Sequence, residues 1–208
     1  METQYRQRLC DGIDQLGLEL DEQTINQLLE YLAMLIKWNK AYNLTAVRDP
    51  MEMIDRHLLD SLSILPYIRE ETLIDVGSGP GLPGIPVAIC KPDVPVITMD
   101  SNGKKTRFQL QVKAQLKLAN LTVEHGRVEE SDVPPAGQVV SRAFASLEDM
   151  ITWCHTLCRE DGIFLAMKGL YPEAELAALP KGYELKDYHR LQVPGTDGER
   201  HLLMLGRG

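Results

Sequence analysis

Long apolar runs are missing from this sequence. None of its 208 residues lies in a stretch of about 18 consecutive apolar side chains, which excludes a helical membrane span. The first residues, METQYRQRLCDG, also lack the hydrophobic region of a secretory signal peptide. We therefore expect a cytoplasmic protein with no membrane partner.

Cysteine is scarce, and its spacing excludes a disulfide framework. The four cysteines are Cys10, Cys90, Cys154 and Cys158, and their positions match none of the patterns of small secreted scaffolds. His155 lies between the last two, but no second pair of ligands accompanies them. We expect no metal site.

Positive charge is in deficit as well. The net charge of -8 argues against a generally basic surface that coats nucleic acid. Residues 100–117 depart from this trend, with five basic side chains against one acidic side chain. Such a cluster is either a solvated helix face or an edge that contacts phosphates. The candidates for phosphate contact are Lys104, Lys105 and Arg107.

The sequence pattern changes near residue 70. Before it, apolar residues recur at helical spacing from Asp21 to about Lys37, and a second helix is expected to begin at Asp49 and end at Pro66. After it, short β-rich runs alternate with helices. We predict an α/β fold in which a helical N-terminal lobe, residues 1–70, precedes a core, residues 71–208. The core sheet is expected to be mainly parallel, with an antiparallel edge strand.

The most informative stretch is LIDVGSGPGLPGIP, residues 73–86. A strand at 73–76 turns into glycines and prolines at its carboxyl end, which is where open α/β sheets bind ligands. GPGLPG matches the dinucleotide pattern GxGxxG, but its register places Leu82 where the third glycine belongs. The competing pattern is acid-x-Gly-x-Gly-x-Gly, typical of S-adenosylmethionine-dependent methyltransferases. It is met in full by Asp75, Gly77, Gly79 and Gly81.

A second acid follows at the expected distance. Asp100 ends the next β-rich run, about 20 residues beyond the loop, where a carboxylate accepts the ribose hydroxyls of an adenosine. Either cofactor class needs such an acid, and the alternative is that Asp100 caps the following helix. Residues 127–129, after the third run, are expected to pass beside the adenine.

Five stretches together resemble one family. WNKAYNLTAVRDP, RHLLDSL, DVGSGPGLPGIP, VSRAFASL and GERHLL are similar to segments of the GidB/RsmG family, bacterial methyltransferases that act on N7 of a guanine in 16S ribosomal RNA. The resemblance extends over nearly the whole chain and implies a Rossmann-like class I core. It further implies that S-adenosylmethionine is the cofactor and that the RNA is bound in the small ribosomal subunit or an assembly intermediate. The cofactor contacts that it implies are Gly77, Leu82, Val128 and Glu129, with Arg142 near the methyl-transfer site.

The chemistry agrees with a ring nitrogen as the nucleophile. Methyltransferases of exocyclic amines often carry Asn/Asp-Pro-Pro-aromatic after the fourth strand, where this sequence reads SRAF. That difference favours a nucleophile with no proton to lose, such as guanine N7. Arg142 is our candidate catalytic residue, acting on guanine O6 or an adjacent phosphate. The alternative is that Arg142 pairs with a carboxylate such as Glu129.

Several further polar residues have two interpretations. Between the N-terminal helices, Lys40, Asn43 and Arg48 either contact RNA or cap the loop. His57 and Asp60 are more consistent with a structural network that docks the lobe than with catalysis. Near the C-terminus, Lys168, Arg200 and His201 are either phosphate contacts or ordinary charges of a sheet edge.

Two other functions remain open from the sequence alone. One is a small-molecule enzyme, either a metabolite methyltransferase or an NAD-dependent oxidoreductase. The other is an RNA-binding assembly factor that kept the pocket without the activity. The acidic total favours recognition of a preformed RNA shape or ribonucleoprotein over generic attraction to phosphate.

Overall fold

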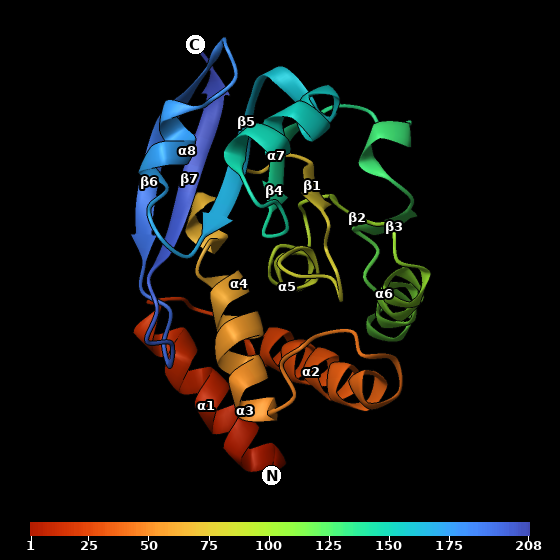
Figure 1. Ribbon diagram of the computed structural model, residues 1–208. Coiled ribbons are helices and arrows are strands. Elements are labelled where there is room, and N and C mark those ends of the chain that lie inside the picture. The colour runs from red at the N-terminus through yellow and green to blue at the C-terminus, as the bar shows by residue number, and fades with distance from the viewer.

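Residues 73–207 carry a seven-stranded sheet with the order β3-β2-β1-β4-β5-β7-β6. The computed structural model describes all residues, 1–208 (Figure 1). Only β7 runs against its neighbours, antiparallel to both β5 and β6, so the predicted mainly parallel α/β sheet is confirmed. The strands are β1 (Leu73–Val76), β2 (Val96–Asp100), β3 (Leu121–His125), β4 (Ala136–Ser141), β5 (Cys158–Lys168), β6 (Tyr183–Leu191) and β7 (Arg200–Arg207).

The first 70 residues are helical, as the pattern predicts. Asp21 caps α2 (Glu22–Tyr42) by accepting from Thr24 N, and Asp49 caps α3 (Pro50–Met53) by accepting from Met51 N. The helix beginning at Pro50 then continues through a π-helical segment. The remaining elements are α1 (Glu2–Gln15), the π-helix η1 (Ile54–Leu59), α4 (Asp60–Leu62) and the 3-10 helix η2 (Leu65–Tyr67). We did not predict α1 as a separate helix, because its buried face is narrow: only Leu9, Gly12 and Ile13 are buried.

Helices cover both faces of the sheet. One face packs against α5 (Gly84–Cys90) and α6 (Gly103–Leu116), and the other against α7 (Leu147–Cys154) and the short elements η3 (Val128–Glu130), η4 (His155–Leu157) and α8 (Glu173–Ala177). Side chains alternate along β1, since Leu73 joins the first apolar cluster and Ile74 the second. No helix combines the length and the apolar character that a membrane crossing requires.

The N-terminal helices pack on the α5 and α6 face. One cluster of 36 buried apolar residues contains side chains of α1, α2 and η1 together with those of α5, α6 and the sheet. Figure 1 shows these helices, red to orange, gathered on one side of the strands. The division at residue 70 stays a prediction, because this shared core joins the two parts.

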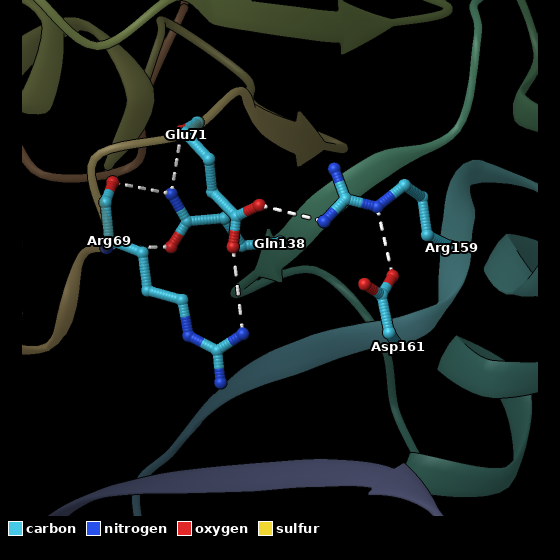
Figure 2. Close-up of polar contacts among 5 residues, drawn as sticks. All are labelled: Arg69, Glu71, Gln138, Arg159 and Asp161. Carbon is cyan, nitrogen blue, oxygen red and sulfur yellow. Dashed lines mark hydrogen bonds and ion pairs between the residues drawn. The ribbon is translucent and has the colours of Figure 1, made fainter.

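A polar network fixes the chain as it enters β1 (Figure 2). The buried amide of Gln138 accepts a hydrogen bond from Arg69 N at 2.9 Å and donates to the carbonyls of Arg69 and Glu71 at 2.9 and 2.8 Å. The Glu71 carboxylate pairs in turn with Arg69 and Arg159, and Arg159 with Asp161. The connection from the N-terminal helices is therefore hydrogen-bonded to β4 just before β1 begins.

Candidate functional site

The predicted site residues gather at the carboxyl edge of the sheet. The glycine loop follows β1, Asp100 ends β2 and Lys168 ends β5. Because β7 is antiparallel to β5, with Lys168 opposite His201, the start of β7 lies at the same edge. Strand β4 ends at Ser141, so Arg142 lies just beyond it. The sheet thus unites residues separated by more than half of the chain.

The glycine loop needs its glycines for two different reasons. Gly77, Gly79 and Gly81 all have positive φ, at 67°, 58° and 104°, a region that favours glycine. A Cβ at Gly77 would lie 2.6 Å from the Cβ of Ala143, and one at Gly81 would lie 2.3 Å from Ile85 Cδ1. A Cβ at Gly79 would meet no atom within 4 Å. Packing therefore requires glycine at positions 77 and 81, whereas Gly79 borders open space with room for a ligand.

Asp100 holds this loop and keeps spare acceptor capacity. Its Oδ2 accepts from Gly79 N and its Oδ1 from Asn102 N, each at 2.8 Å. The N-cap of α6 is Asn102, which accepts from the backbone nitrogens of Lys104 and Lys105. The capping role considered for Asp100 is therefore wrong. Each carboxylate oxygen has a further lone pair, so Asp100 fits two ribose hydroxyls beside the open space at Gly79.

Two buried polar side chains support the loop from the N-terminal lobe and from α6. Tyr31 donates its hydroxyl hydrogen to the carbonyl of Pro80 at 2.9 Å. Gln109 Nε2 donates to Ser78 Oγ at 2.9 Å and to the carbonyl of Gly79 at 2.7 Å. Sequence reasoning missed both residues, because a single polar position on an amphipathic helix carries no signal of its partner.

Asp75 lies beneath the loop. Its side chain is fully buried, and Oδ2 accepts from Gly84 N at 2.8 Å, which anchors the start of α5. Burial raises the pKa of this carboxyl well above its ordinary value. Oδ1 has no hydrogen-bond partner in the protein. The direct cofactor contact that we predicted for Asp75 stays a prediction.

The remaining candidate cofactor contacts have unequal exposure. Leu82 is buried in the larger apolar cluster. Val128 is half-buried in η3 and packs on the second cluster, and Glu129 beside it is exposed. Since η3 follows β3, which neighbours β2, these two residues lie on the Asp100 side of the loop.

Arg142 pairs with a carboxylate of the N-terminal helices. Its Nη1 lies 3.1 Å from Oδ2 of Asp60, and Arg200 Nε and Nη2 donate to the two oxygens of Asp60 at 2.7 and 3.1 Å. The alternative that Arg142 pairs with a carboxylate is therefore confirmed, with Asp60 as the partner in place of Glu129. Asp60 docks the lobe on the core, as expected for a structural network.

A polar cleft of about 480 Å³ opens beside these arginines. It lies between the segment that begins at α3 and the turn before β7, and it has no apolar lining residue. Its lining consists of Glu52, Asp55, Arg56, Asp60, Arg142, Gly169, Gly195, Thr196, Asp197, Gly198, Glu199 and Arg200. A cleft of this composition suits a charged, hydrated ligand better than an apolar metabolite.

His57 lies near Arg142 and is neutral at physiological pH. It is 5% exposed, and Nε2 lies 2.7 Å from Thr45 Oγ1. Burial, followed by the positive charge of Arg142, lowers the pKa of His57 to about 4. An imidazole with this pKa carries no charge between pH 6 and pH 8.

The loop between α2 and α3 uses most of its polar side chains internally. Asn39 accepts from Thr45 N, and Asn43 Oδ1 accepts from Arg48 Nη2 at 2.9 Å. Asn43 is also the left-handed C-cap of α2. Asn39 and Asn43 thus stabilise the loop, and RNA contact by the exposed Lys40 and by Arg48 stays a prediction.

The other candidate RNA contacts fall into two groups. Lys104 and Arg107 are exposed at the start of α6, and Lys105 is half-buried beside them. In contrast, Lys168 pairs with Glu175 at 3.0 Å, and the buried His201 lies 3.2 Å from Glu199. Lys104, Lys105 and Arg107 are therefore more accessible to phosphates than Lys168 and His201.

The cysteine-rich stretch has no ligand geometry. Burial raises the pKa of Cys154 to about 12 and that of Cys158 to about 11, so neither is a ready thiolate. No group of three or more His, Cys, Asp or Glu side chains is arranged to hold a metal ion.

Comparisons with solved structures first define the class. A SAM-dependent methyltransferase from Aquifex aeolicus has a TM-score of 0.59 at 13% identity, covering 78% of this chain and 96% of its own. TYW2 from M. jannaschii, solved in complex with AdoMet, has a TM-score of 0.56 at 14% identity, covering 72% and 75%. The fold is that of a Rossmann-like methyltransferase.

Sequence comparisons then define the family. The model of the family GidB, rRNA small subunit methyltransferase G, matches residues 24–203. Ribosomal RNA small subunit methyltransferase G from Pseudomonas aeruginosa strain LESB58 is 55% identical over 205 residues, covering 98% of this chain and 96% of its own. The protein of that name from Marinobacter nauticus is 53% identical with the same coverage. The chain belongs to the GidB family.

Proposed function

We propose that this enzyme methylates N7 of a guanine in 16S ribosomal RNA, with S-adenosylmethionine as methyl donor. One observation carries the proposal. Asp100 accepts a hydrogen bond from Gly79 N beside an open space, at the carboxyl edge of the sheet where Arg142 follows β4. Family membership supports small-subunit ribosomal RNA as the substrate.

Each group of residues at this edge has its own role in the proposed reaction. Asp100 accepts the ribose hydroxyls, the positive-φ glycines admit the methionine end, and the η3 segment borders the adenine. The cofactor, when bound, supplies a methyl group on a sulfonium. Transfer to a nitrogen lone pair is an in-line displacement, so the protein must mainly align the two partners and complement the changing charge. Arg142 supplies a guanidinium for the electron-rich O6 edge of guanine.

A neutral His57 agrees with a nucleophile that has no proton to lose. His57 lies at the Arg142 end of the site, and its pKa of about 4 leaves it unable to change charge near neutrality. We therefore expect a single-turnover rate that is nearly flat between about pH 6 and pH 8 when methyl transfer limits the rate. A tenfold rise per pH unit would contradict attack by N7.

The direct test is transfer of labelled methyl groups. Purified protein, labelled S-adenosylmethionine and small subunits from a strain lacking the gene are mixed, and the 16S RNA is digested and mapped by mass. We expect one methyl group on guanine N7. Label on an exocyclic nitrogen or a ribose oxygen would contradict the proposed nucleophile, and RNA binding without transfer would favour an assembly factor.

A further inference from the structure

Asp60 joins two arginines from distant parts of the chain. Its side chain is buried, at 3% exposure for the residue. Arg200, at the start of β7, donates to both of its oxygens, and Arg142, just after β4, lies 3.1 Å from Oδ2. One carboxylate of the N-terminal helices is thus the common partner of two cations in the core.

The two arginines contact Asp60 differently. Arg200 makes two aligned hydrogen bonds, the arrangement that fixes a carboxylate most firmly. Arg142 Nη1 is buried within ion-pair distance but makes no hydrogen bond in the protein. Arg200 therefore holds Asp60, while Asp60 holds the buried Nη1 of Arg142 by charge and leaves the donors on Nε and Nη2 of Arg142 available.

Asp60 also prevents repulsion between the two arginines. Without this carboxylate the two guanidiniums would repel each other. Arg142, whose side chain is 26% exposed, would then be free to turn toward water. We propose that Asp60 is a positioning residue that holds Arg142 in its orientation for methyl transfer, and that Arg200 acts by fixing Asp60. This inference rests on the proposed function. It gives Arg200 a role other than the phosphate contact predicted from the sequence.

The test uses the near-isosteric Asp60→Asn variant of the full chain. With saturating small subunits and cofactor, the single-turnover rate should fall about 10- to 100-fold, because misplaced groups near the reacting atoms lower the rate steeply. Affinity for the small subunits should change by less than about twofold. Arg200→Gln should lower the rate in the same way and leave the salt dependence of RNA binding unchanged.

A double-variant experiment separates positioning from general damage. In an Arg142→Ala background, Asp60→Asn should change the rate by less than about twofold, because no guanidinium remains to be positioned. The matched control is Glu71→Gln. Glu71 precedes β1 and pairs with Arg159 at 2.9 Å, at the opposite edge of the sheet from Arg142. The Glu71→Gln variant should lower the melting temperature and leave the rate unchanged.

Three outcomes would overturn the inference. The first is an equal loss of rate in Glu71→Gln, and the second is a loss in Asp60→Asn that persists in the Arg142→Ala background. The third is a normal rate in Arg200→Gln with a salt slope lower by about 0.7 to 0.9, the value of one phosphate contact. Should Asp60→Asn fail to fold, Arg200→Gln carries the same test, because it removes the two hydrogen bonds that fix Asp60 but leaves a cation beside this buried carboxylate. Failure of the proposed function is distinct, because the unaltered protein would then transfer no label.

Discussion

The backbone nitrogen of Gly79 donates a hydrogen bond to the carboxylate of Asp100 at 2.8 Å. This bond joins the turn after β1 to the end of β2, so that the loop and the acid form one surface. Since a Cβ at Gly79 would point into open space, a side chain there should obstruct a ligand before it disturbs the protein.

Gly79→Arg should abolish cofactor binding while the protein stays folded. The added side chain occupies the space next to Asp100, and the positive φ of 58° adds some strain. Isothermal titration with S-adenosylhomocysteine measures the affinity, and thermal unfolding checks the fold. Gly77→Ala is the informative comparison, because its Cβ would lie 2.6 Å from that of Ala143 and should cost stability. Near-normal affinity in a folded Gly79→Arg protein would refute the assignment of the loop.

Tyr31→Phe should weaken the cofactor without breaking the core. The phenyl ring fills the same buried volume, but the hydrogen bond to the carbonyl of Pro80 is lost. A net loss of about 0.5 to 1.5 kcal/mol corresponds to about a 2- to 10-fold weaker binding of S-adenosylhomocysteine if the loop transmits it. Tyr42→Phe, at an exposed position, should leave the affinity unchanged. Equal affinities in both variants would mean that α2 does not support the loop.

Replacing Lys104, Lys105 and Arg107 by Ala should weaken RNA binding and flatten its salt dependence. Each lost phosphate contact lowers the slope of log affinity against log salt by about 0.7 to 0.9. Cofactor affinity should not change, because Asp100 is held by the backbone nitrogens of Gly79 and Asn102 and not by these side chains. The control replaces Lys181 and Lys186, near the far end of β6. Normal methylation at every salt concentration would show that the α6 cluster is only a solvated face.

His57 should make the free energy of unfolding fall as the pH falls. Its pKa is about 4 in the folded protein against an ordinary 6.5, so between these values the unfolded chain binds a proton that the folded chain does not. The stability is fully present above pH 6.5 and is lost as the pH falls toward 4. Between pH 7 and pH 4.5, the free energy of unfolding that His57 contributes falls by about 2 to 3 kcal/mol.

The measurement is urea unfolding of the unaltered protein and of His57→Gln at both pH values. The difference between the two proteins isolates this histidine from the buried Asp75, whose raised pKa acts in the opposite direction. His155→Gln, at an exposed position, should behave like the unaltered protein. An identical pH dependence in all three proteins would show that His57 titrates normally.

Gln138→Ala should destabilise the protein by about 2 to 4 kcal/mol, because one buried amide makes three hydrogen bonds to the backbone of Arg69 and Glu71. The network in Figure 2 lies before the start of β1, whereas the glycine loop follows the end of that strand, so binding of S-adenosylhomocysteine should persist. Gln115→Ala removes an exposed bond to Glu30 and should change stability by less than about 0.5 kcal/mol. Equal stabilities in urea would contradict the role assigned to Gln138.

Local rules of the sequence determined a large part of this protein. The helix start at Asp21, the cap at Asp49, the strand at 73–76 and the turn at Gly77 all lie where the pattern predicts them. These features depend on neighbours within a few residues, such as a carboxylate facing a helix's first amides or a glycine at positive φ. The alternation of strands and helices likewise determined the α/β class.

The tertiary structure alone decided which distant residues became partners. Asp60 pairs with both Arg142 and Arg200, whereas the sequence suggested Glu129 as the partner of Arg142. Asn102 caps α6, whereas the sequence suggested Asp100 for that role. An ion pair across 140 residues depends on how the N-terminal helices pack against the sheet, which no local pattern encodes. A buried charge takes the partner that packing brings within reach, because leaving it unpaired costs more than any local preference supplies.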